Sequence, residues 1–180
     1  THCLEKLGNP EQGPSYQRIL NVLESKDRIP HVTTHGRDVQ TKERIFFNFW
    51  KDDVNPKGIW RQTTASSYYN NKNTEEHPKW ETVLDVDALA EQDGISWVWK
   101  GSRLLPRKRD DPTVNGGQLV TRALLSLSRG GSDAIHLKEF DMVSKSFVPA
   151  AEGGFVLPEA KTRASYKSRD VLLVGSDFGE

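Results

Sequence analysis

The chain has 180 residues, of which 35% are hydrophobic and 28% are charged, a composition on the polar side of the globular range. Lys and Arg together number 25, as do Asp and Glu, so no overall field favours nucleic acid or an anionic membrane surface. The single cysteine, Cys3, excludes an internal disulfide framework and a cysteine metal cluster.

No apolar run in the sequence is long enough for a membrane span or a signal peptide, so we expect no membrane partner and a cytoplasmic location. The chain starts at Thr1 rather than at a methionine, and it stops at Glu180 just after a strand-like run. This pattern favours a piece of a longer protein.

The first predicted element is a helix. Four apolar residues that follow Pro14 recur at the spacing of one helical face: Tyr16, Ile19, Leu20 and Leu23. The polar residues and the proline at 27–30 end this pattern. We therefore expect residues 1–30 to form a helical lead-in whose apolar stripe packs on a domain, with recognition of a partner as the alternative.

The first strand patterns follow this lead-in. Residues 30–43 read as an extended connection without a core face of their own. Residues 45–50 and 59–64 are rich in residues that suit a pleated sheet, and the turn between them contains Pro56 and Gly58, so they predict a hairpin. The polar tract 65–79 is expected to be a surface loop.

The next segment combines two strand patterns with a long loop. Residues 80–87 and 95–99 have strand character, and residues 89–94 suit a short helical turn. The loop at 101–117 contains a basic group at 107–109, but Asp110 and Asp111 offset its charge and no aromatic residues alternate with it. We therefore expect no nucleic-acid partner.

Residues 123–148 predict an antiparallel meander. Apolar and polar side chains alternate up to a turn at 129–133, and the strand pattern resumes at Ile135. Phe140 and Met142 are out of phase with Ile135 and Leu137, which indicates either a bulge near 138–139 or a strand that is buried on both faces.

Parts of this region recur along the chain. The motif at 95–97 matches 164–166, the motif at 124–128 matches 172–176, and a weaker echo sets 84–86 against 140–142. The first copy carries an insertion about the size of the basic loop, and without it the spacing approaches the roughly 40 to 50 residues of a four-stranded propeller blade. We therefore expect residues 31–180 to be all-β, forming two to three antiparallel blades of a partial β-propeller whose exposed edges favour self-association.

Several blocks resemble the prolyl oligopeptidases, specifically their N-terminal propeller. These blocks are residues 48–52, 55–64, 80–90, 125–134, 139–141, 145–148, 153–161 and 172–179. Three segments look longer than the family pattern: 40–43, 70–73 and 108–119.

The resemblance implies a serine peptidase built from a seven-bladed propeller and an α/β-hydrolase domain, which cleaves short peptides after proline without a metal or organic cofactor. In such an enzyme the propeller caps and gates the catalytic cleft. The implied partners are the hydrolase domain of the same polypeptide and short proline-containing peptides. A non-enzymatic propeller that serves as a scaffold for protein–protein interaction is the alternative.

The sequence offers no catalytic residue. A hydrolase nucleophile requires Ser in G-x-S-x-G on a strand-to-helix elbow, and this motif does not occur. The nearest approach, with Ser132 at the centre of 130–134, lacks the final glycine and falls in the predicted hairpin turn. We therefore expect the catalytic domain to be absent from this chain and the chain alone to be inactive.

No cofactor-binding or metal-binding residue is assigned either. His31 and His35 have i, i+4 spacing, but Pro30 and Gly36 flank them and no Glu follows His31. The Asp-Phe-Gly triplet at 177–179 lacks the other kinase motifs. His136 is expected to be a hydrogen-bonded sheet residue. Five tryptophans are expected to pack in the core rather than to form a ligand platform: Trp50, Trp60, Trp80, Trp97 and Trp99.

Overall fold

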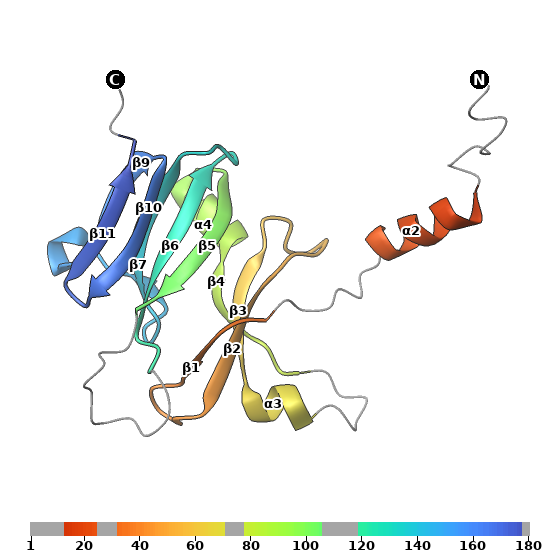
Figure 1. Ribbon diagram of the computed structural model, residues 1–180, viewed down its shortest axis with the longest axis horizontal. Coiled ribbons are helices and arrows are strands. Elements are labelled where there is room, and N and C mark those ends of the chain that lie inside the picture. Colours follow the sequence, from red (N-terminus) through yellow and green to blue (C-terminus); the bar gives the residue numbers. More distant parts are fainter. Residues whose placement is uncertain (1–12, 25–31, 71–77, 106–118, 178–180) are drawn as a thin grey trace. The chain divides into compact units, whose positions relative to one another are not determined.

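The computed structural model divides the chain into two compact units, Thr1–Pro30 and His31–Glu180 (Figure 1). The residues that it describes are 13–24, 32–70, 78–105 and 119–177.

The first unit contains helix α2 (Pro14–Glu24), which confirms the helix predicted from the apolar spacing. Tyr16 and Ile19, on its apolar stripe, are exposed. Among the described residues, no helix is both long and apolar enough to cross a membrane.

The second unit begins with a four-stranded antiparallel sheet, here called the first sheet. Its strands follow chain order: β1 (Thr33–Arg37), β2 (Arg44–Trp50), β3 (Ile59–Thr64) and β4 (Glu81–Asp85). The hairpin of β2 and β3 is as predicted, but the expectation of a simple connection over 30–43 is wrong. Backbone pairing of Gly36 with Ile45 makes β1 an edge strand, and such pairing needs no apolar pattern.

Two helices interrupt segments predicted otherwise. Helix α3 (Ala65–Asn70) replaces the start of the loop expected over 65–79, and the Thr64 hydroxyl caps it by accepting the Ser67 N–H (3.2 Å). Helix α4 (Val86–Asp93) starts one turn earlier than the predicted helical turn because the Asp85 carboxylate accepts the N–H groups of Asp87 (2.8 Å) and Ala88 (3.0 Å).

The second sheet has five strands and contains the predicted meander. Three long strands lie in chain order, β5 (Trp97–Leu104), β6 (Arg122–Arg129) and β7 (Ile135–Asp141), and both β8 (Ser146–Phe147) and β9 (Val156–Ala160) pair with β7. The pairing of β7 with β6 is unbroken past 138–139, and Leu137 and Phe140 belong to different core clusters. Strand β7 is therefore buried on both faces rather than bulged at that point.

The third sheet is the hairpin of β10 (Thr162–Ser168) and β11 (Val171–Ser176). Its two strands correspond to β5 and β6, as the repeat in the sequence predicts. The strand pairing does not, however, support the match of residues 95–97 to residues 164–166. Arg103 pairs with Leu124 and Tyr166 pairs with Leu172, so Arg103, not Trp97, is the equivalent of Tyr166. The weaker echo at 84–86 and 140–142 is wrong, since it sets the fourth strand of one sheet against the third strand of the next.

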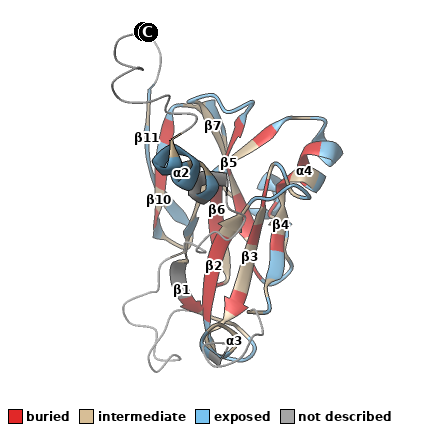
Figure 2. Cartoon of the chain, turned by 90° about the vertical axis from the view of Figure 1, so that its right-hand side faces the viewer, coloured by how far each residue is buried: buried red, intermediate tan, exposed pale blue. Residues whose placement is uncertain are grey.

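The apolar core lies between consecutive sheets. Phe47 and Trp60 of the first sheet pack with Leu125 and Phe140 of the second, and Figure 2 shows the buried residues running along β2 and β6. A separate cluster joins the second sheet to Tyr166 and Ala164 of the third. Full burial of one large apolar side chain contributes about 1.5–3 kcal/mol, so these face-to-face contacts hold the sheets together. The architecture is mostly β, with antiparallel sheets of four, five and two strands.

Candidate functional site

The turn between β6 and β7 contains Ser132, the serine closest to a nucleophile motif. The residue is exposed, and its hydroxyl donates to the carbonyl oxygen of Ala134 (3.1 Å). The neighbouring Gly130 and Gly131 have positive φ values of 59° and 87°, as a tight hairpin turn requires. This is a strand-to-strand turn and not the strand-to-helix elbow of a hydrolase nucleophile.

The histidines form no metal centre in the described part of the chain. His136 Nε2 lies 3.3 Å from Glu159 Oε2. The His136 ring packs edge-on against the Trp97 ring, with ring centroids 5.3 Å apart. No group of three potential ligands lies together among the described residues. His31 lies outside these residues, as do the side chain of His35, Cys3, the basic group at 107–109 and the last two residues of the triplet at 177–179.

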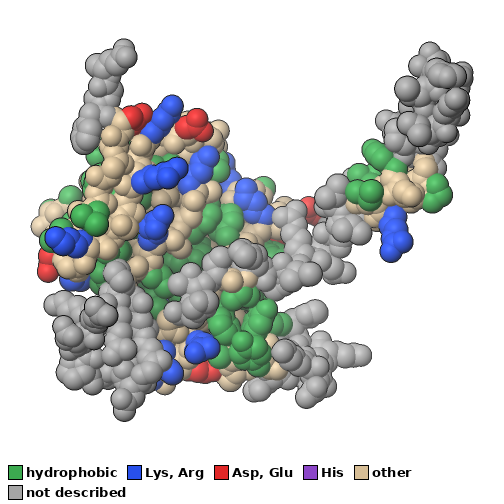
Figure 3. All heavy atoms as spheres, in the orientation of Figure 1, with side chains coloured by type: hydrophobic (Ala, Val, Ile, Leu, Met, Phe, Trp, Pro, Cys, Tyr) green, Lys and Arg blue, Asp and Glu red, His purple; other side chains and the backbone are tan. Residues whose placement is uncertain are grey.

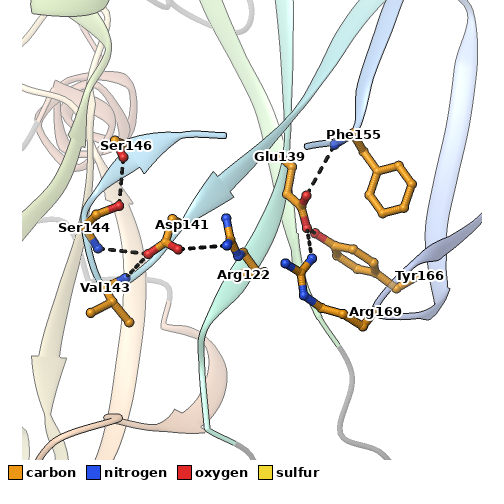
Figure 4. A network of polar contacts seen from close by, with 9 residues as sticks. All are labelled: Arg122, Glu139, Asp141, Val143, Ser144, Ser146, Phe155, Tyr166 and Arg169. Carbon is orange, nitrogen blue, oxygen red and sulfur yellow. Dashed lines mark hydrogen bonds and ion pairs between the residues drawn. The ribbon is translucent and has the colours of Figure 1, made fainter. Parts of the chain in front are cut away.

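The most developed polar arrangement in the described chain surrounds Glu139 on β7, whose side chain is completely buried (0% exposed) (Figure 4). Oε1 accepts hydrogen bonds from the Tyr166 hydroxyl (2.9 Å) and from Arg169 Nη1 (3.1 Å). Oε2 accepts the N–H of Phe155 (3.3 Å). The donors thus come from the segment before β9, from β10 and from the turn that follows β10.

The backbone of Glu139 is fixed as well. Its N–H donates to the Phe155 carbonyl oxygen (2.7 Å), and its carbonyl oxygen accepts the Val148 N–H (2.9 Å). Removing a carboxylate from water costs several kcal/mol unless charge and hydrogen bonds compensate, and Arg169 with the two other donors provides that compensation. The network therefore locks the second sheet to the third.

The electrostatics of the network keep Tyr166 protonated. Burial first, and then the hydrogen bond and the negative charge of Glu139, raise the pKa of the Tyr166 phenol well above its ordinary value. The phenol therefore keeps its proton and donates a hydrogen bond to Glu139 throughout the physiological pH range. The arrangement is suited to structural support rather than to proton transfer near neutral pH.

A second carboxylate on the same strand closes the turn from β7 to β8. Asp141 accepts the N–H groups of Val143 (2.8 Å) and Ser144 (2.9 Å) and pairs with Arg122 on β6 (3.2 Å) (Figure 4). Burial acts to raise the pKa of Asp141, but the N–H donors and the positive charge of Arg122 outweigh it, so the pKa is lowered.

On the first sheet, Arg61 is held between two tryptophan rings. Its guanidinium carbon lies 4.4 Å from the ring centroid of Trp50 and 4.6 Å from that of Trp80, and its Nε donates to Asn48 Oδ1 (2.8 Å). Such stacking combines cation–π attraction with burial of apolar surface. Sequence patterns do not predict this arrangement, because only the register of the strands brings these three side chains together.

The five tryptophans thus divide into two groups. Trp60 and Trp97 are buried core residues, and Trp99 stacks on Phe49 with ring centroids 5.1 Å apart. These three agree with the core prediction. Trp50 and Trp80 instead flank Arg61.

The chain is similar to known peptidases over most of its length. No protein-family model matches the chain. It is 34% identical over 176 residues to an uncharacterized peptidase of Sinorhizobium fredii, covering 97% of this chain and 21% of that protein. It is 29% identical over 163 residues to an uncharacterized peptidase of Rickettsia prowazekii, covering 88% of this chain and 20% of that protein.

A solved structure of a post-proline cleaving enzyme from Rickettsia typhi matches 99% of this chain and 24% of that chain, with a TM-score of 0.65 and 26% sequence identity. The chain is a prolyl oligopeptidase-like region. It spans about a fifth of the length of the curated peptidases that it matches. The resemblance predicted from the sequence blocks is therefore confirmed for this partial region.

Proposed function

We propose that the chain is the first part of the β-propeller of a serine peptidase that cleaves short peptides after proline. The observation that carries the proposal is the match of nearly the whole chain to the post-proline cleaving enzyme of Rickettsia typhi. In this reading the intact protein is a cytoplasmic hydrolase that needs no cofactor, and its propeller caps and gates the active site.

The strand order supports the propeller. The first and second sheets are consecutive antiparallel meanders that pack face to face, and the third sheet begins with the same strand pair as the second. Four strands in meander order occur in both β1–β4 and β5–β8, and consecutive meanders of this kind are typical of propeller blades, although β9 adds a fifth strand to the second sheet. Three side chains on β11 that a further strand or blade would cover are exposed: Val171, Leu173 and Val174.

The same proposal makes the hydrolase domain of the same polypeptide the partner of this region. The described residues supply a scaffold and no nucleophile–base pair, and the sequence contains no G-x-S-x-G. The catalytic residues would then lie outside this chain, and proline-containing peptides would pass the propeller to reach the active site.

The test combines sequence and activity. The coding region downstream of residue 180 is expected to contain G-x-S-x-G, and the encoded protein should hydrolyse a fluorogenic peptide with an internal proline. The 180-residue chain alone should be inactive on that peptide. Replacing the elbow serine of the encoded protein by alanine is the matched control and should abolish activity.

Two results would count against this function. Hydrolysis by purified 180-residue chain, retained when co-purifying peptidases are removed, would contradict the assignment of the chemistry to another domain. A downstream sequence without a hydrolase elbow would favour the alternative of a propeller scaffold for protein–protein interaction.

A further inference from the structure

A cavity of about 300 Å³ lies between the second and third sheets. Strands β5 and β10, the first strands of their respective sheets, provide most of its walls. The polar side chains that line it are three cations and three hydroxyls: Lys100, Arg103, Arg163, Ser102, Ser126 and Thr162. No carboxylate from the described part of the chain lines the cavity, although acidic and basic residues are equal in number in the sequence.

The positive charge of this cavity is not neutralised by the described residues. Arg103 and Arg163 make no ion pair with any of them, and Lys100 Nζ donates only to the carbonyl oxygen of Gly131 (3.2 Å). In contrast, Arg122 and Arg169 are paired with acids elsewhere in the same sheets. Figure 3 shows Lys and Arg side chains gathered over β5, β6 and β10.

A bulge on β5 contributes to this arrangement. Trp99 pairs with Leu127 and Gly101 pairs with Ser126, so Lys100 is an extra residue on β5. Gly101 has φ 132°, a conformation that side-chain-bearing residues rarely adopt. Bulges of this kind redirect neighbouring side chains, and here Lys100, Ser102 and Arg103 all reach the same cavity.

The buried hydroxyl of Ser128 is a second observation on the same strand as Ser126. Ser128 is completely buried, and its Oγ has no hydrogen-bond partner among the described residues. It follows Ser126 by two residues on β6, so the two side chains lie on the same face of that strand. Ser128 does not itself line the cavity, but buried hydroxyls are nearly always hydrogen-bonded, and the hydration water of an anion bound beside Ser126 would provide a partner.

From these contacts we propose that the cavity between β5 and β10 is a binding site for a small oxyanion, a phosphate or a carboxylate. Arginine presents paired N–H donors that match both groups, and hydroxyls complete such sites. The two sources share this chemistry: an inorganic or esterified phosphate, and the free carboxyl terminus of a short peptide. The site does not depend on the function proposed above.

The test is a titration of the isotopically labelled 180-residue chain, followed by NMR, with inorganic phosphate and separately with N-acetyl-alanine. Saturable shifts are expected at the amides of Gly101, Ser126 and Ala164. Binding of phosphate alone would identify a phosphate site, binding of N-acetyl-alanine alone a carboxylate site, and binding of both a general oxyanion site.

Variants that each remove one positive charge distinguish binding at a defined site from general electrostatic attraction of the anion. Arg103→Gln and Arg163→Gln should each weaken binding at least five-fold, whereas Lys167→Gln, an exposed cation on β10 that does not line the cavity, should change it less than two-fold. Absence of saturable shifts with either anion would overturn the proposal. Equal weakening by all three variants would also overturn it, because it would indicate only diffuse surface charge.

Discussion

The hydroxyl of Tyr166 donates a 2.9 Å hydrogen bond to the fully buried carboxylate of Glu139, so a strand of the third sheet compensates a charge inside the second. The first prediction removes this donor. Tyr166→Phe should destabilise the chain by about 1–3 kcal/mol, because a buried acceptor loses a partner. Urea unfolding followed by circular dichroism measures the change. Tyr68→Phe is the control, since no hydrogen bond to the Tyr68 hydroxyl occurs among the described residues, and an equal loss there would contradict the prediction.

The second prediction concerns alkaline pH. Because burial and Glu139 raise the pKa of Tyr166 above the ordinary value of 10.0, an unfolded tyrosine ionises before the folded one. The corresponding stabilisation is complete below about pH 10 and is lost as pH rises toward the folded-state pKa. Urea midpoints measured from pH 8 to pH 11 should therefore fall more steeply for the wild-type chain than for Tyr166→Phe. Parallel curves would show that the phenol does not contribute.

The third prediction concerns acidic pH. The pKa of Asp141 lies below its ordinary value of 3.8, so its contribution is present above about pH 4 and is lost as pH falls through the folded-state pKa. Asp141→Asn should cost about 1 kcal/mol at pH 7 and should flatten the acid limb of the stability curve. Asp133→Asn, in the exposed turn between β6 and β7, is the matched control and should leave that limb unchanged.

The fourth prediction tests a close backbone approach. A Cβ on Gly154 would lie 2.2 Å from the carbonyl oxygen of Val148, and neither backbone can give way without disturbing the segment that leads into β9. Gly154→Ala should therefore destabilise the chain by about 2 kcal/mol or more. Gly175→Ala, where a Cβ would meet nothing within 4 Å, should change the free energy of unfolding by less than about 0.5 kcal/mol. Similar losses of stability in the two variants would contradict the predicted clash.

The fifth prediction concerns self-association, which the sequence predicted from exposed sheet edges. Leu173 is 58% exposed on β11, an edge strand whose only strand partner in the described chain is β10. Leu173→Lys should reduce the mass measured by light scattering at high protein concentration, because a charge on an edge opposes strand pairing. If the wild-type chain remained monomeric at all protein concentrations, the prediction of self-association would be wrong.

Sequence patterns predicted the strands that carry their own periodicity. The hairpin of β2 and β3 and the meander of β6 and β7 follow from apolar alternation and turn residues. Strand β1 was missed because backbone pairing to β2 defines it and its residues are polar or small. The start of α4 was missed because one capping carboxylate, Asp85, decides it.

The Glu139 network was missed for a different reason. A glutamate in a strand ordinarily faces water, and its partners Tyr166 and Arg169 follow much later in the chain. One signal was available: Glu139 is in phase with Ile135 and Leu137, so alternation already placed the carboxylate on an apolar face. Identifying what compensates it required the register between sheets, which single-sequence patterns do not contain.

The position of Glu139 also has a consequence for how the protein is made. Synthesis proceeds from the amino end, so β7 leaves the ribosome before Tyr166 and Arg169 emerge from it. Until they appear, the Glu139 carboxylate must keep its water, and the face of β7 that carries it must stay open. We expect the second sheet to become stable only when the third has begun to form, so that released chains that end before residue 162 should be protease-sensitive at β7 and those that extend past Arg169 should be protected.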